Sequence, residues 1–134
     1  MKAVRTDRAP APVGPYSQAI EHSGWVFASG QIPLDPATGE LVAGDIEAQT
    51  RAVLANLKAV LEASGASFSN VVRTTIYLTD LANFPRVNAV YGEHFSTEPQ
   101  PARATVQVTA LPLGAEIEID AIAAMDFRSG RPGT

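Results

Sequence analysis

Residues 45–78, with the sequence DIEAQTRAVLANLKAVLEASGASFSNVVRTTIYL, contain the two patterns that decide the fold. Asp45 is a typical helix N-cap, and Glu47 in the first turn is favourable to the helix dipole. Apolar residues recur at helical spacing up to Gly65, a typical C-terminal stop; they are Ile46, Val53, Leu57, Val60 and Leu61. In residues 71–78 the side chains alternate between two faces, as they do in a β-strand.

On the N-terminal side of this stretch we expect a β-hairpin preceded by an extended arm. Residues 18–22 and 25–29 are rich in β-branched or aromatic side chains and flank the turn dipeptide Ser23-Gly24. The arm, residues 1–15, contains three prolines, which disfavour a helix or a central strand. Residues 33–44, with the turn signals Asp35-Pro36 and Thr38-Gly39, are expected to form a loop.

On the C-terminal side we expect a second helix and two more strands. Asn83 could cap the helix, and Pro85 is tolerated in its first turn. The apolar stripe of this helix is Phe84, Val87, Tyr91 and Phe95, while Gly92 inside it costs about 1 kcal/mol relative to alanine. Strands are expected at residues 103–108 and 115–123. The order β-β-α-β-α-β-β predicts an α+β fold in which one sheet carries both helices on a single face. Residues 1–134 are expected to form one domain, with a frayed tail at 128–134.

The composition excludes several classes of protein. The chain has 134 residues, of which 46% are hydrophobic and 18% charged, as in a globular domain. Its net charge of −4 provides no basic face for nucleic acid. Cysteine is absent, which rules out disulfides, thiolate zinc sites and a cysteine nucleophile. The first residues lack the apolar segment of a secretory signal, and no apolar run approaches the roughly 20 residues that span a bilayer. We therefore expect a cytoplasmic protein that has no membrane or nucleic-acid partner.

The last two strands contain the most informative polar pattern. Glu116, Glu118 and Asp120 share one face, and Arg103 shares a face with Thr105 and Gln107. If the two strands pair as a hairpin with their apolar faces together, Arg103 lies near the acidic row. This row could be a solvated face with a cross-strand ion pair. It could also be a site in which the arginine binds a substrate carboxylate and an acidic residue transfers a proton. The pattern alone does not decide between them.

Five segments resemble the RidA/YjgF family in order and spacing, from about Pro10 to about Ala124. They are GPYSQA at 14–19, SGQIP at 29–33, VNAVY at 87–91, PARATV at 101–106 and IEIDAIA at 117–123. The resemblance implies a chorismate-mutase-like α+β fold that forms a homotrimer with sites between subunits. It also implies hydrolysis of 2-imino acids and their enamine tautomers to 2-keto acids and ammonia, without metal or organic cofactor.

The resemblance also implies roles for individual residues. Arg103 matches the arginine that binds the substrate carboxylate, and Glu118 matches the acidic residue that positions or activates water. The pocket-lining residues are Tyr16, Ser29, Asn88 and, through its backbone, Gly30. Thr105, also assigned to the substrate site, stands where many relatives carry cysteine, so a thiol-based role is in doubt here.

Two alternatives remain beside the deaminase hypothesis. One is a non-catalytic trimer that binds small acidic ligands or acts like a chaperone; such a protein needs Arg103 but not Glu118. The other is RNA cleavage, which the acidic composition and the absence of paired histidines disfavour. His22 and His94 lie far apart in the sequence and have no metal-ligand spacing, so we expect packing or surface roles for both. Phosphate-binding glycine loops are absent from the sequence.

Overall fold

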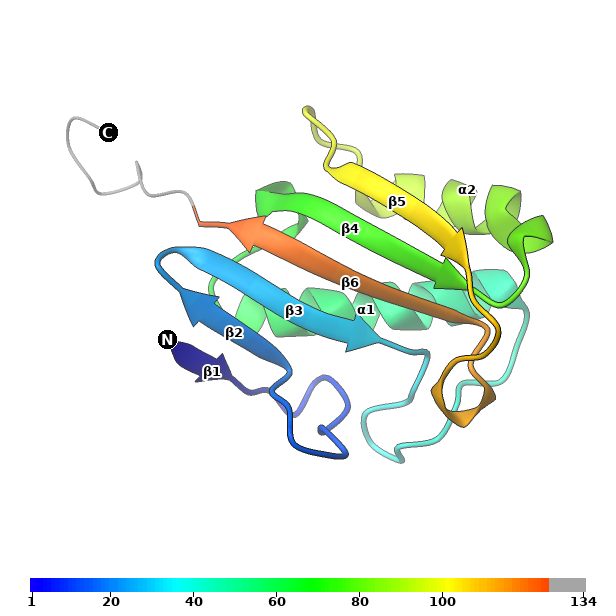
Figure 1. Ribbon diagram of the computed structural model, residues 1–134, viewed down its shortest axis with the longest axis horizontal. Coiled ribbons are helices and arrows are strands. Elements are labelled where there is room, and N and C mark those ends of the chain that lie inside the picture. The colour runs from blue at the N-terminus through cyan, green and yellow to red at the C-terminus, as the bar shows by residue number, and fades with distance from the viewer. Residues whose placement is uncertain (126–134) are drawn as a thin grey trace.

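The computed structural model describes residues 1–125 and contains one six-stranded sheet with two helices on one of its faces (Figure 1). The strands are β1 (Lys2–Val4), β2 (Ala19–His22), β3 (Trp25–Gln31), β4 (Val71–Leu78), β5 (Ala102–Gln107) and β6 (Ile117–Ala124). The helices are α1 (Ile46–Ala63) and α2 (Phe84–His94). The predicted α+β class and the order of the predicted elements are confirmed. The tail expected at residues 128–134 lies outside the described residues.

The first strand, β1, was not predicted. It lies inside the arm but before the first proline at position 10, so no proline interrupts it. It pairs antiparallel with β2, with Lys2 opposite Glu21 and Val4 opposite Ala19. The predicted β2–β3 hairpin is confirmed, and both turn residues have positive φ, 50° at Ser23 and 81° at Gly24.

The expected hairpin between the last two strands is wrong. The strand order is β1-β2-β3-β6-β4-β5, so β6 lies between β3 and β4, and β5 pairs in parallel with β4 at the edge. Burial explains the difference. Every second residue of β6 is buried, as in a central strand, whereas no residue of β5 is buried. A parallel pair requires a crossover connection, and α2 provides it between β4 and β5.

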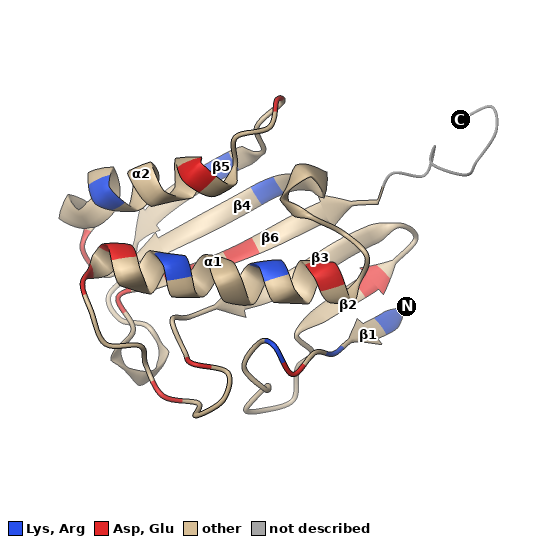
Figure 2. Cartoon of the chain, turned by 180° about the vertical axis from the view of Figure 1, so that it is seen from behind, with Lys and Arg blue, Asp and Glu red and all other residues tan. Residues whose placement is uncertain are grey.

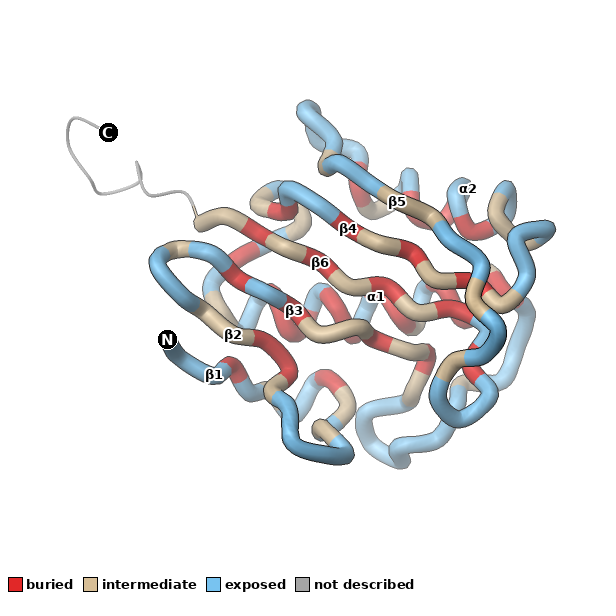
Figure 3. Tube along the Cα trace, viewed as in Figure 1, coloured by how far each residue is buried: buried red, intermediate tan, exposed pale blue. Residues whose placement is uncertain are grey.

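The core lies between the helices and the sheet (Figure 3). The predicted stripe of α1 is buried, and Val53, Leu57, Val60 and Leu61 are 0% exposed. At the start of this helix, the Asp45 side chain accepts a hydrogen bond from the Ala48 amide at 2.9 Å, so the predicted cap is confirmed. Asn83 occupies the N-cap position of α2 as predicted, but its side chain makes no capping hydrogen bond. Instead Asp80 caps a short 3-10 turn that precedes α2.

The sheet has two unequal faces. The helix face is covered by α1 and α2, as the reverse view shows (Figure 2). We call the other face the open face; among its residues are Phe27, Tyr77, Val106, Glu118 and Asp120. Apolar side chains are left uncovered there, with Phe27 46% and Val106 40% exposed. Within residues 1–125, no helix combines the length and apolarity required to cross a membrane.

Candidate active site

Arg103 lies on the helix face of the edge strand β5, beside α2. Its Nη1 donates a 2.7 Å hydrogen bond to Oδ1 of Asn88. The guanidinium carbon lies 4.9 Å from the ring centre of Tyr91 and 5.2 Å from that of Phe84, within the range of cation–π attraction. Three side chains of one helix therefore fix this guanidinium, whose Nε and Nη2 make no hydrogen bond within residues 1–125.

A cleft of about 420 Å³ opens beside Arg103. Its lining residues are Asn88, Tyr91, Gly92, Gln100, Pro101 and Arg103. Burial raises the pKa of the Tyr91 phenol, whose hydroxyl shares a 2.7 Å hydrogen bond with that of Thr74. A neutral ring therefore lies beneath the positive charge. A fixed guanidinium at the wall of a cleft is suited to a carboxylate ligand.

Glu118 lies on the open face, opposite Tyr77 in the neighbouring strand β4. Burial raises the pKa of its carboxyl group, and the negative charge of Asp120 raises it further. The carboxylate rests against the backbone of Gly30, where an added Cβ would come within 2.7 Å of the Glu118 Cδ atom. Only glycine leaves room for Glu118 in this position. A carboxyl group of raised pKa is a stronger base than an ordinary glutamate.

Arg103 and Glu118 lie on opposite faces of the sheet, contrary to the expectation that Arg103 lies near the acidic row. Arg103 pairs with Thr74, which is buried beneath α2, whereas Glu118 pairs with Tyr77 on the open face. The expectation failed because it rested on a β5–β6 hairpin with coinciding apolar faces. In the structure, Ala104 and Val106 of β5 lie on the open face and the polar residues lie on the helix side.

The other predicted pocket residues divide between these two regions. Asn88 contacts Arg103, and Thr105 lies on the same face of β5, paired with buried Ile76. Ser29 and Gly30 lie where the register between β3 and β6 shifts. The Ser29 hydroxyl donates a 2.6 Å hydrogen bond to the Ser17 carbonyl, which joins β3 to the short segment between the arm and β2. Tyr16, 52% exposed, lies in the same segment.

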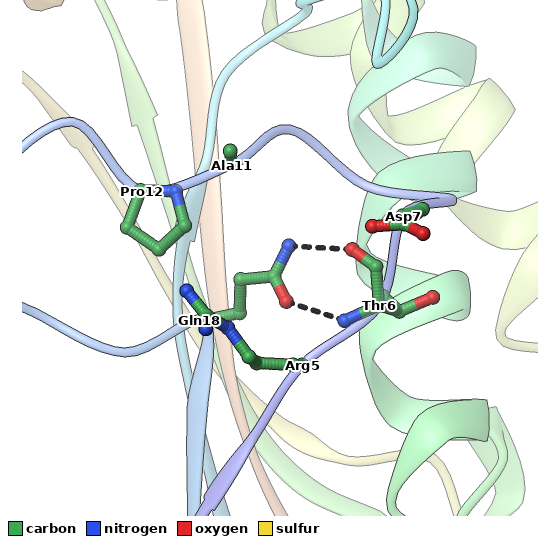
Figure 4. Close-up of a pocket in the computed structure, with 6 residues that line it drawn as sticks. All are labelled: Arg5, Thr6, Asp7, Ala11, Pro12 and Gln18. Atoms are coloured by element: carbon green, nitrogen blue, oxygen red, sulfur yellow. Dashed lines mark hydrogen bonds between the residues drawn. The ribbon is translucent and has the colours of Figure 1, made fainter.

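Gln18, directly before β2, anchors the N-terminal arm at Thr6 and Pro10, a structural role that the sequence did not predict. It is buried, and its Oε1 accepts from the Thr6 amide at 2.8 Å while its Nε2 donates to the Thr6 carbonyl at 3.0 Å (Figure 4). The Nε2 also donates to the Pro10 carbonyl at 2.9 Å. A hollow of about 370 Å³ lies beside it. The sequence contains no clear signal for this role, because Gln18 stands between Ser17 and Ala19 directly before β2.

Neither histidine joins the two regions. Nδ1 of His94 lies 3.0 Å from the Val90 carbonyl, and His22 lies at the β2–β3 turn. Within the described part of the chain, no group of three or more metal-ligating side chains gathers. Tyr77 was also missed as a possible site residue: its hydroxyl donates a 3.0 Å hydrogen bond to Oδ2 of Asp120. The alternation of residues 71–78 could have placed it on a face but not beside the acidic row.

Comparisons with known proteins agree on one family. The chain matches the family model described as Endoribonuclease L-PSP over residues 6–125. It is 61% identical to Protein DfrA of Myxococcus xanthus, covering 91% of this chain and 94% of that protein. It is 52% identical to the chloroplastic Reactive Intermediate Deaminase A of Arabidopsis thaliana, covering 92% of this chain and 66% of that protein.

A solved structure agrees with these sequence matches. The crystal structure of E. coli TdcF with bound serine has a TM-score of 0.88 and 41% sequence identity, and the match covers 94% of this chain and all of that one. Matches at this identity over nearly the whole chain identify more than a shared fold. The chain belongs to the RidA/YjgF family.

Proposed function

We propose that this protein hydrolyses 2-imino acids and their enamine tautomers to 2-keto acids and ammonia, as a homotrimer whose sites lie between subunits. The observation that carries the proposal is the combination of a fixed guanidinium, Arg103, with a half-buried carboxyl group of raised pKa, Glu118. A protein that only binds acidic ligands needs the first group but not the second.

The two groups are proposed to act on one substrate from different chains. Within one chain they lie on opposite faces of the sheet, so a small molecule cannot contact both. The open face favours association, because Phe27 and Val106 expose apolar surface that a second copy would cover. In β5 the apolar residues Ala104 and Val106 lie on the open face, away from the helices, and a second copy that covers this face would bury them. The trimeric state itself is inferred from the family resemblance.

The chemistry follows from the substrate. A 2-imino acid carries a planar carboxylate beside an electrophilic C=N carbon. The Nε and Nη2 of Arg103, which make no hydrogen bond within residues 1–125, present two donors to that carboxylate. As a water oxygen adds to the C=N carbon, Glu118 accepts a proton from that water and passes it to the imine nitrogen, which gives a tetrahedral adduct with one hydroxyl and one amino group. Glu118 then accepts the hydroxyl proton and donates it to the amino nitrogen, while an oxygen electron pair forms the C=O bond and ammonia leaves.

The names of similar proteins support this proposal. One relative at 52% identity is called a Reactive Intermediate Deaminase, and one solved structure of the family holds serine, a small molecule that carries a carboxylate beside a nitrogen-bearing carbon. Asn88, Tyr91 and Phe84 hold Arg103 in position before a ligand arrives, which lowers the entropic cost of binding. We also propose a cytoplasmic location and a single domain over residues 1–134, and both proposals rest on the sequence.

The first test is an activity assay. A pyridoxal-phosphate dehydratase generates 2-iminobutanoate in situ, and its decay is followed with and without this protein. Acceleration that survives exhaustive chelation supports the proposal, whereas decay at the spontaneous rate contradicts it. The same preparation is incubated with a labelled RNA. Cleavage of the RNA without imine hydrolysis would favour the activity after which the family model is described.

The second test asks whether the site is shared between chains. Arg103→Ala and Glu118→Gln chains, each inactive alone, are unfolded together and refolded at equal ratio. If each site combines Arg103 of one chain with Glu118 of another, random mixing restores both groups in about one quarter of the sites. Native mass spectrometry counts the mixed trimers. Mixed trimers without regained activity would show that the two groups do not act in one shared site.

A further inference from the structure

Tyr77 and Asp120 form a polar contact on the open face directly beside Glu118. Tyr77 lies opposite Glu118 in the pairing of β4 with β6. Its hydroxyl extends diagonally to Asp120 and donates a 3.0 Å hydrogen bond to Oδ2 of that residue. The contact is partly buried, and burial together with the bond to Asp120 raises the pKa of the Tyr77 phenol. The phenol therefore remains a donor over the physiological pH range.

Within residues 1–125 of one chain, Asp120 is the principal charged neighbour of Glu118; the proposed assembly adds Arg103 of a second copy on the far side of the substrate. From β3, the residues beside it are Gly30, in contact through its backbone, and Gln31, opposite Ile119; neither carries a charge. From β4 it faces Tyr77, while Arg73 lies further along the same face, opposite Ile122. The carboxylate of Glu116, directly before β6, accepts a 3.2 Å hydrogen bond from Gln49 of α1.

We propose that Tyr77 and Asp120 are positioning residues for Glu118: the Tyr77 hydroxyl holds the Asp120 carboxylate directed along the open face, and that fixed negative charge favours proton uptake by Glu118. The inference rests on the proposed function, because it assigns the neighbours that prepare Glu118 to act as a base. A hydrogen bond from a phenol fixes the direction of a carboxylate, and a like charge nearby makes a second carboxylate a stronger base.

Two consequences distinguish this role from a packing role. Asp120→Asn removes the charge but keeps the size of the side chain, so Glu118 should lose its proton at lower pH than in the wild type. The acid limb of the kcat profile should move to lower pH with it, while the maximal kcat stays within about threefold of the wild-type value. Tyr77→Phe should move the limb in the same direction by a smaller amount, because Asp120 remains but is no longer held.

The matched control is Glu116→Gln. Glu116 and Asp120 both lie two residues from Glu118 and carry the same charge. Glu116, however, is exposed and accepts its hydrogen bond from Gln49 of α1. Its substitution should leave the acid limb and kcat near those of the wild type. A double variant, Tyr77→Phe with Asp120→Asn, should behave as Asp120→Asn alone if Tyr77 acts through Asp120.

The decisive measurement does not require turnover. The carboxyl carbon of Glu118 is followed by ¹³C NMR during pH titration of the substrate-free protein, and the Glu118→Gln variant assigns its signal. A lower titration midpoint in Asp120→Asn but not in Glu116→Gln supports the inference even if the protein proves inactive on imines. An unchanged midpoint in an Asp120→Asn variant of wild-type mass overturns the inference even if the deaminase activity is present. If Asp120→Asn fails to assemble, Tyr77→Phe provides the same comparison, and an unchanged midpoint there counts against the inference.

Discussion

The Arg103 region and the Glu118 region treat a charged side chain in opposite ways: the first fixes an accessible positive charge, whereas the second disfavours a negative one. Arg103 lies on an edge strand, where one amide and two aromatic rings from α2 fix a charge that stays accessible to a ligand. Glu118 lies on a central strand, where burial and a like charge disfavour its ionised form. In the proposed mechanism, the first region binds the substrate through a fixed charge, whereas the second gains and loses a proton. Partial burial suits the second role because it raises the pKa of a carboxyl group.

Removal of the base should have the largest effect. Glu118→Gln keeps the shape of the side chain and removes the group that takes the proton of water, so kcat should fall by about 10² to 10⁴ while KM changes little. Stopped-flow decay of 2-iminobutanoate measures both constants, after light scattering has verified that the variant has the mass of the wild type. Near-normal kcat in a correctly assembled variant would contradict the proposed mechanism and favour the binding-module alternative.

The same substitution bears on stability. Because the folded state raises the pKa of Glu118, the folded chain binds more protons than the unfolded chain between the ordinary and the raised pKa, and stability falls as pH rises through that window. Glu118→Gln should therefore be more stable than the wild type above the window and should lose this pH dependence.

Loss of the planar guanidinium of Arg103, which can donate two parallel hydrogen bonds to a carboxylate, should have the second largest effect. Arg103→Lys keeps the positive charge but cannot donate to Asn88 and to both carboxylate oxygens at once, so kcat/KM should fall by about 10², almost as far as in Arg103→Ala. Arg51→Lys on the exposed side of α1 is the control for a general effect of the exchange. Substantial activity in Arg103→Lys would mean that charge alone, without fixed geometry, is sufficient in this region.

A smaller loss is expected at Gly30, which belongs to the Glu118 region alone. A methyl group there overlaps the Glu118 carboxylate, so Gly30→Ala should displace that side chain and reduce kcat by about tenfold without weakening the binding of carboxylates to Arg103. A competing 2-keto acid, titrated by calorimetry, reports the binding separately. If affinity falls together with kcat, the two regions are less independent than their positions in one chain imply.

The smallest effect is expected at Gly92, in the wall of the Arg103 cleft. Its backbone is helical, and an added Cβ meets no atom within 4 Å, so no packing reason within the described residues requires glycine. Gly92→Ala should raise the free energy of unfolding by about 1 kcal/mol, the helix-propensity difference. Urea unfolding measures this gain. A loss of stability or assembly would show that a partner chain occupies the space beside Gly92.

Much of the fold could be read from local patterns. The spacing of Val53, Leu57 and Leu61 predicted α1 and its buried stripe because helical periodicity reports which side faces the core. Alternation in residues 117–123 likewise separated Ile117 and Ile119 from Glu118 and Asp120. The family itself followed from five short segments. None of these inferences requires knowledge of which strands are neighbours.

The tertiary structure decided which strands pair and, through that, where the charges lie. Sequence alternation states which residues of a strand share a face, but not which of the two sheet faces that will be; a wrong neighbour for β5 therefore placed Arg103 beside the acidic row. The sequence of β5 gave the wrong signal because its apolar residues, Ala104 and Val106, lie on the open face instead of against α2. Local periodicity is set by backbone geometry within one segment, whereas strand order and facing depend on contacts between segments far apart in the chain.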